Sequence, residues 1–218
     1  SDMNLSNTQC QIVEAPMYKP IQVLASAGSG KTRVLTERVR YILEKTKKEG
    51  VIALTFTNKA AEEMSSRLAT CDQVEDRAWI ATIHSVAQRI LEKYGHTVGL
   101  PTELSIYDRD KDRMEVFMQS LREDGVDIDA YLNISDTNEL KSREKNLQSY
   151  MDIFSKIKRE LLTELDISEQ YPDNNIWKIF QDYQNALLNS GGIDYDDILV
   201  YAHRILMTHE WIAKIYRS

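Results

Sequence analysis

A loop of small residues joins an apolar run to a helical pattern near the start of the chain, and it constrains the fold more than any other feature. The stretch reads IQVLASAGSGKTRVL, from Ile21 to Leu35. Glycines let a backbone curl around a ligand, and the free N–H groups of a helix start, together with a lysine, favour phosphate. A strand, this loop and a helix therefore predict the phosphate-binding unit of an α/β domain.

The loop matches the pattern GxxxxGK[ST] at every fixed position except the first, where Ala25 replaces glycine. We expect Lys31 to contact the outer phosphates of a nucleotide and Thr32 to offer its hydroxyl to Mg²⁺. The alternative is a glycine-rich turn with a solvated lysine, but the flanking strand and helix favour nucleotide. The predicted nucleotide contacts in this loop are Ala25, Ser26, Ala27, Gly28, Ser29, Gly30, Lys31 and Thr32, with catalytic roles for the last two.

Three continuous apolar runs, which begin at Ile21, Val51 and Trp79, are typical of parallel strands covered on both faces. Helical patterns follow them over residues 31–47, 59–68 and 85–94. This alternation predicts an α/β fold with right-handed crossovers, a parallel sheet with helices on both faces.

The strand signal stops after Pro101, and the rest of the chain reads as amphipathic helices. They cover residues 108–123, 147–165 and 176–188, a loop is expected over residues 123–140, and a last helix follows a Gly-Gly turn over residues 190–206. Trp177 and Tyr183 recur at helical spacing and are expected in the core. Lys156, Lys158 and Arg159 are typical of a solvated helix face, with contact to duplex DNA as the alternative.

Charge is divided unevenly along the chain, whose net charge is −7. Residues 1–95 hold 13 basic and 11 acidic side chains, whereas residues 96–218 hold 14 basic and 23 acidic ones. Only the first part therefore suits a phosphate backbone, and the acidic second part makes duplex binding by the helical region doubtful.

Nucleotide hydrolysis also needs an acid at the end of a strand to hold Mg²⁺. The sequence contains no Asp-Glu dipeptide, and none of the three apolar runs ends in an acid. Asp194, Asp196 and Asp197 are the nearest substitute, but they begin a helix, where the helix dipole favours acids. We expect a structural role for them.

The sequence resembles the N-terminal part of superfamily 1 DNA helicases of the UvrD/Rep/PcrA type. LSNTQCQIV, from Leu5, is similar to their Q motif, ASAGSGKTRVLTERV to motif I, ALTFTNKAAEEMSSRL to motif Ia and TIHSVAQRIL to motif Ib. IDYDDIL is similar to the DFDDLL segment that precedes their Walker B strand. The resemblance implies ATP and Mg²⁺ as cofactors, and alanine at the position of Ala25 is usual in this family.

Two further residues are implied to bind the nucleotide. Gln9 would hydrogen-bond the adenine, and Arg33 would lie against the base. The alternatives are a surface position for Gln9 in a first helix and an i,i+4 pair between Arg33 and Glu37.

Single-stranded DNA is the implied partner of motifs Ia and Ib. Phe56 would stack on a base, which contributes about 1–3 kcal/mol without sequence preference, with core packing as the alternative. A His-Ser cap at a helix start is the alternative for the motif Ib residues. The predicted DNA contacts are Phe56, Thr57, Asn58, Lys59, Thr82, His84 and Ser85.

The resemblance implies a partial RecA-like motor domain, called 1A, over residues 1–95 and an all-helical insertion, 1B, over residues 96–192. Residues 193–218 would return to 1A and end before the Walker B motif. The expected function is the N-terminal part of an ATP-dependent 3′ to 5′ helicase that acts at junctions of single- and double-stranded DNA. The C-terminal remainder of that helicase would be a partner of this chain. The 218-residue chain alone would not hydrolyse ATP.

Two rival functions remain open on the sequence. One is a naturally short module that binds nucleotide or single-stranded DNA without turnover. The other is a small P-loop kinase, which should carry an arginine-rich lid and an acid that ends an early strand, and we find neither. The sequence has no membrane span and no basic-then-apolar leader, so the expected compartment is the cytoplasm.

Overall fold

The computed structural model of the chain describes residues 6–13, 22–26, 29–45, 50–55, 57–71 and 77–208. The chain divides into two compact units. The first unit comprises Ser1–Val98 and Tyr201–Ser218, and the second comprises Gly99–Val200. No helix in the part of the chain that is described has the length and apolar character needed to cross a membrane.

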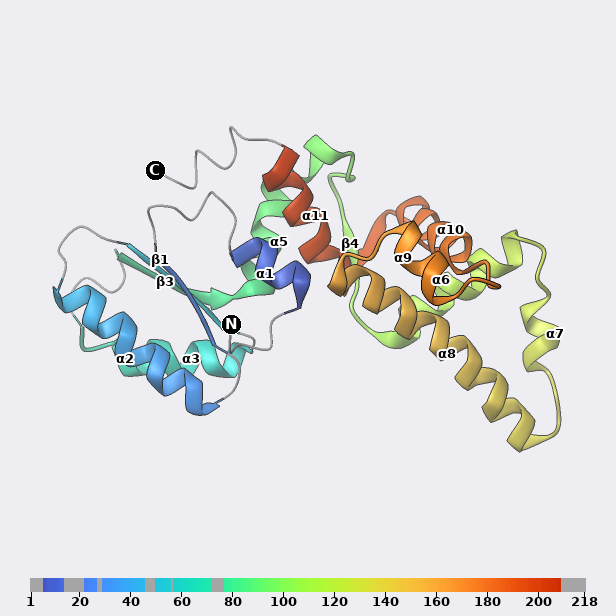
Figure 1. The fold of residues 1–218 in the computed structure, drawn as a ribbon, viewed down its shortest axis with the longest axis horizontal. Helices are drawn as coiled ribbons and strands as arrows, with labels where there is room; N and C mark the ends of the chain where they lie inside the picture. Colours follow the sequence, from blue (N-terminus) through green and yellow to red (C-terminus); the bar gives the residue numbers. More distant parts are fainter. Residues whose placement is uncertain are drawn as a thin grey trace. The chain divides into compact units, whose positions relative to one another are not determined.

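A three-stranded parallel sheet organises the first unit (Figure 1). Its strands are β1 (Gln22–Ser26), β2 (Val51–Thr55) and β3 (Ala78–Thr82), in that spatial order. The connecting helices are α2 (Ser29–Lys45) and α3 (Asn58–Leu68), while α5 (Ile83–Tyr94) follows β3 directly. The predicted parallel α/β arrangement of strands and helices is therefore confirmed. The unit also contains α1 (Asn7–Val13) and the short 3₁₀ helix η2 (Gly95–Val98).

The alternation of side chains along β2 gives this sheet two buried faces. Val51 and Ala53 pack with Val39 of α2 and Met64 of α3 in one hydrophobic cluster. Ile52 and Leu54 point to the other face, as the period of two in a strand requires, and both are buried. Four consecutive apolar residues at the start of β2 are thus explained by helices on both sides of the sheet (Figure 1).

The second unit is mostly helical. Its helices are α6 (Asp110–Glu123), α7 (Ile128–Leu132), α8 (Thr137–Glu160), α9 (Glu164–Gln170) and α10 (Ile176–Asn189), and α11 (Tyr195–Thr208) begins in this unit and ends in the first. Aromatic rings form its centre: Phe154 stacks on Tyr183 with centroids 5.3 Å apart, and Phe117 meets Phe154 edge-on at 5.3 Å. The expected core position of Tyr183 is confirmed.

Two expectations about the secondary structure of this unit were wrong. Strands β4 (Ser105–Tyr107) and β5 (Gly192–Asp194) form a parallel pair where we expected no strand. They are too short for their apolar pattern to be recognised, and their pairing joins segments far apart in the sequence. A Cβ on Gly192 would lie 2.4 Å from Tyr107 Cε2, so the glycine is needed for this close approach.

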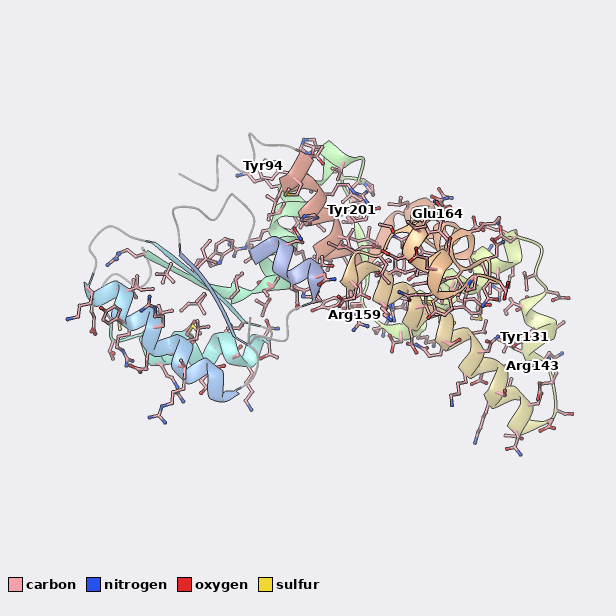
Figure 2. The ribbon with its side chains drawn as sticks, viewed as in Figure 1. Tyr94, Tyr131, Arg143, Arg159, Glu164 and Tyr201 are labelled. Atoms are coloured by element: carbon pink, nitrogen blue, oxygen red, sulfur yellow. The ribbon has the colours of Figure 1, made fainter. Side chains whose placement is uncertain are left out.

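The expected loop over residues 123–140 contains α7 and the start of α8. Both helices begin at aspartates whose side chains accept backbone N–H groups: Asp127 accepts from Ala130, and Asp136 accepts from Asn138 and Glu139. Arg143 of α8 lies 4.9 Å from the ring centre of Tyr131 in α7 and donates to its carbonyl oxygen at 2.8 Å (Figure 2). Asp127 and Asp136, which we interpreted as part of a loop, are therefore helix N-caps.

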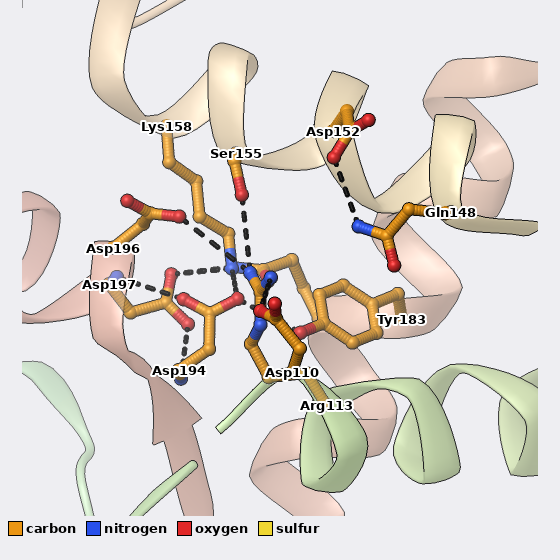
Figure 3. A network of polar contacts seen from close by, with 11 residues as sticks. Asp110, Arg113, Gln148, Asp152, Ser155, Lys158, Tyr183, Asp194, Asp196 and Asp197 are labelled. Atoms are coloured by element: carbon orange, nitrogen blue, oxygen red, sulfur yellow. Dashed lines mark hydrogen bonds and ion pairs between the residues drawn. The ribbon is translucent and has the colours of Figure 1, made fainter. Parts of the chain in front are cut away.

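Lys158 is buried, with 3% of its surface exposed, so neither of its expected roles is correct. Its Nζ lies 2.7 Å from Asp194 Oδ2 and 3.1 Å from Asp197 Oδ1 (Figure 3). Lys156 and Arg159, its neighbours on α8, are exposed. One residue of the charge run therefore points inward and holds β5 and the first turn of α11.

The two carboxylates that Lys158 holds also bond to each other's backbone. Asp194 N–H donates to Asp197 Oδ2 at 3.1 Å, and Asp197 N–H donates to Asp194 Oδ1 at 3.0 Å. Tyr183 Oη donates to Asp194 Oδ2 at 2.9 Å, and Gln184 Nε2 donates to Asp197 Oδ1 at 3.0 Å. These hydrogen bonds form a capping box at the start of α11. Its two carboxylates are buried, and Lys158 neutralises part of their charge.

Burial and charge act in opposite directions on these groups. Burial raises the pKa of Asp197 to about 6, although Lys158 attracts its charged form. Burial would also raise the pKa of Asp194, but Lys158 and the hydroxyl of Tyr183 hold it below its ordinary value. Burial would lower the pKa of Lys158, and the two carboxylates raise it instead. Lys158 thus stays charged because both aspartates face it.

Replacing Lys158 with methionine should destabilise the second unit by about 3–5 kcal/mol, because two buried carboxylates lose their counter-charge. The measurement is urea unfolding followed by Trp177 fluorescence, with Trp79 and Trp211 changed to phenylalanine. Lys156→Met, the same change on the exposed face of α8, is the control. Equal free energies of unfolding for the two variants would contradict the structural role of Lys158.

Candidate functional site

The candidate site lies at the carboxyl edge of the sheet in the first unit. Parallel pairing aligns Ser26 with Thr55 and Thr55 with Thr82, so the last residues of β1, β2 and β3 are in register. A helix begins within three residues of each strand end, at Ser29, Asn58 and Ile83. Parallel α/β sheets bind ligands at this edge. The segments predicted to bind phosphate and DNA therefore share one edge.

The phosphate loop connects β1 to α2. Ala25 and Ser26 end the strand, and Ser29, Gly30 and Lys31 form the first turn of the helix. Ala27 and Gly28 lie outside the described residues. The first turn of a helix presents backbone N–H groups and the positive end of its dipole, an arrangement that favours phosphate.

Thr32 follows in α2 and is 1% exposed. Its carbonyl oxygen accepts a hydrogen bond from Thr36 Oγ1 at 2.7 Å, which holds this turn. Mg²⁺ in nucleotide sites is bound by phosphates, water and one or two carboxylates, with a Ser or Thr hydroxyl in P-loops. The position of Thr32 one residue after Lys31 fits that role, which stays a prediction.

The two other residues predicted to bind nucleotide have different surroundings. Gln9 Oε1 accepts the N–H of Ser6 at 3.1 Å, and Gln9 N–H donates to Ser6 Oγ at 3.2 Å. This capping box starts α1 and uses one of the two lone pairs of the Gln9 carboxamide oxygen. Arg33 is exposed on α2, and Glu37 pairs with Arg40 at 2.7 Å rather than with Arg33. Adenine contact by Gln9 and Arg33 stays a prediction.

The segment after β2 presents polar groups at the start of α3. Thr57 Oγ1 accepts the N–H of Ala60 at 3.1 Å, and Thr55 Oγ1 donates to the carbonyl of Thr57 at 3.0 Å. Asn58 and Lys59 are exposed, as a contact with a DNA backbone requires. Phe56 lies outside the described residues, so its stacking on a base stays a prediction.

The segment after β3 is held by a Thr-Ser cap rather than the His-Ser cap that we considered. Thr82 Oγ1 accepts the N–H of Ser85 at 3.1 Å, and Ser85 Oγ donates to the Thr82 carbonyl at 2.9 Å. Burial lowers the pKa of His84 from 6.5 to about 4, so its imidazole is neutral at pH 7. His84 would thus meet DNA as a neutral hydrogen-bonding group. The DNA contacts of all three residues stay predictions.

The sequence analysis did not assign a functional role to two residues near the segments of motifs Ia and Ib. Trp79 of β3 and Arg89 of α5 line a groove together with Asn58, Thr82 and Ser85. Arg89 follows Ser85 by one helical turn, which is the only signal that could have indicated it.

The second unit contains Asp194, Asp196 and Asp197, which the sequence analysis named as the nearest substitute for the missing acid. Asp194 and Asp197 are each 1% exposed and hold Lys158, and Asp196 lies 3.8 Å from Arg113. No group of three or more His, Cys, Asp or Glu side chains in the described ranges is arranged to bind a metal ion. The ion pairs support the structural role that we expected for these aspartates.

Comparison with known proteins identifies the family. The profile of the UvrD/REP helicase N-terminal domain matches residues 5–218. The chain belongs to this family. The resemblance inferred from the motifs is therefore confirmed.

The family relatives include named helicases. The chain is 30% identical to a probable DNA helicase II homolog of Mycoplasma capricolum over 99% of its length. It is also 30% identical over 91% of its length to the ATP-dependent DNA helicase PcrA of Staphylococcus aureus, and 29% identical over 90% to PcrA of Staphylococcus epidermidis. The chain spans 29% of the first relative and 26% of each of the other two.

The lowered pKa of His84 makes the stability of this UvrD/REP-type domain pH-dependent. The unfolded chain binds a proton near pH 6.5 and the folded one near pH 4, so stability is lost as the pH falls through this range. The loss should approach about 3 kcal/mol. Urea unfolding of the wild type and His84→Gln at pH 7 and pH 4.5 measures it, with the exposed His96→Gln as control. Equal pH dependence in wild type and His84→Gln would contradict this assignment.

Proposed function

We propose that the chain forms the nucleotide- and single-stranded-DNA-binding part of an ATP-dependent DNA helicase. The observation that carries this proposal is the shared carboxyl edge, where the register of Ser26, Thr55 and Thr82 brings the phosphate loop beside the two segments of motifs Ia and Ib. The names of the relatives, which are DNA helicases, support it. Junctions of single- and double-stranded DNA are the proposed substrate.

The two compact units suit the two parts of such a motor. We propose that the first unit is motor domain 1A and that the second is insertion 1B. The 3′ to 5′ direction of movement follows from the family resemblance. Thr57, Asn58 and Lys59 would hold the DNA backbone beside a nucleotide bound at the start of α2. Binding of the nucleotide would then alter the end of β2, which leads into these DNA contacts.

ATP with Mg²⁺ is the proposed cofactor. The start of α2 would hold the β- and γ-phosphates, Lys31 would neutralise their charge, and Thr32 would bind the metal ion. These residues bind and orient the nucleotide. Mg²⁺, when bound there, would neutralise part of the charge on the phosphates.

We further propose that the 218-residue chain binds ATP but hydrolyses it negligibly. The residues after β1, β2 and β3 are Ala27, Phe56 and Ile83, so no strand of the described sheet leads into an acid. The carboxylates of Asp194 and Asp197 form ion pairs with Lys158. None of the three described strand ends thus supplies a carboxylate that would position Mg²⁺ and the attacking water.

Lys31→Ala should weaken the binding of a fluorescent MgATP analogue about tenfold or more, because a charged contact contributes about 1.5–3 kcal/mol. Lys45→Ala, at the other end of α2, is the matched control and should bind as the wild type does. Phosphate release from MgATP, with and without single-stranded DNA, should not exceed that of Lys31→Ala. DNA-stimulated release that Lys31→Ala abolishes would contradict the proposed lack of turnover.

Lys59→Ala should weaken binding of an oligo(dT) strand about threefold to tenfold and reduce the dependence of log Kd on log salt by about 0.7. Fluorescence anisotropy at several salt concentrations measures both effects. Lys45→Ala removes the same charge far from the carboxyl edge and serves as control. Equal salt dependence for Lys59→Ala and the wild type would contradict a phosphate contact at Lys59.

A further inference from the structure

A groove of about 570 Å³ runs along β3 between α3 and α5 in the first unit. Trp79 lies on β3, Glu62, Ser65 and Ser66 line the groove from α3, and Arg89 lines it from α5. β3 is an edge strand of the described sheet. The volume suits a ligand of nucleotide size, since small-ligand sites are commonly about 300–1,000 Å³.

Arg89 and Trp79 form a cation–π pair in this groove. The Arg89 Cζ atom lies 5.0 Å from the centre of the Trp79 ring. Trp79 is partly buried, whereas Arg89 is exposed, so the ring supports the guanidinium from the protein side. A guanidinium has two flat faces, so one that lies over an indole ring can still stack a further planar group on its exposed side.

The charges of the groove favour a base over a phosphate. Glu62 and Arg89 carry opposite charges, and the other polar lining residues named above are neutral serines. A phosphate group would meet the repulsion of Glu62, while a nucleobase is uncharged. A base also has a flat face for Arg89 and an edge of donors and acceptors for the hydroxyl groups.

The groove continues the predicted DNA surface. Asn58, Thr82 and Ser85, which we expect to contact single-stranded DNA, also line it. We propose that the groove takes one unstacked base of the bound strand, which lies on Arg89 in a stack of indole, guanidinium and base. This inference rests on the proposed DNA binding and adds Trp79 and Arg89 to the residues that perform it.

Substitution of Arg89 tests the stack. Arg89→Ala and Arg89→Lys should each weaken oligo(dT) binding about tenfold, because lysine keeps the charge but has no plane to stack, and one stacked base contributes about 1–3 kcal/mol. Lys93→Ala, one turn further along α5, removes an exposed charge outside the groove and should bind within about twofold of the wild type. The readout is anisotropy of a labelled oligonucleotide, with unchanged unfolding midpoints as the check on folding.

Tryptophan fluorescence reports on the stack itself. In a chain with Trp177 and Trp211 changed to phenylalanine, oligo(dT) should change the emission of Trp79, and Arg89→Lys should remove that change. Wild-type affinity in Arg89→Lys, or an equal loss in Lys93→Ala, would overturn the base-binding groove while DNA binding stands. A wild-type chain that does not bind oligo(dT) would overturn the proposed DNA binding itself.

Discussion

Parallel pairing of β1, β2 and β3 is the constraint on which the candidate site depends. Their register places Ser26, Thr55 and Thr82 side by side, so three strand-to-helix connections open at one edge. An antiparallel strand would send its connection to the opposite edge. The segments predicted to bind nucleotide and DNA are far apart in the sequence. The sheet brings them to the same edge.

The second unit is stabilised by a different device. Aromatic side chains form its core, and the buried charge of Lys158 joins α8 to β5 and the first turn of α11. The same aspartates could be taken for a metal site on composition alone. Their backbone bonds and their ion pairs assign them to the capping of α11, so the acidic sequence near Asp194 stabilises the second unit.

Sequence patterns correctly predicted the strands and helices that can be recognised from residues close together in the chain. The runs at Val51 and Trp79 form strands, and the patterns before Leu68 and Tyr94 form helices, because their apolar residues recur at the spacing of each element. The pairing of β4 with β5 and the burial of Lys158 depend on segments that meet only in the folded chain. Trp79 was recognised as part of a strand, but its contact with Arg89 crosses from strand to helix and leaves no periodic signal.

Hydrogen–deuterium exchange tests the shared carboxyl edge most directly. A non-hydrolysable MgATP analogue should slow exchange at the start of α2, and oligo(dT) should slow it at the starts of α3 and α5. The opposite ends of β1 and β2, at Gln22 and Val51, serve as internal controls and should exchange as in the free chain. Protection confined to those opposite ends or to the second unit would contradict a common nucleotide and DNA site at this edge.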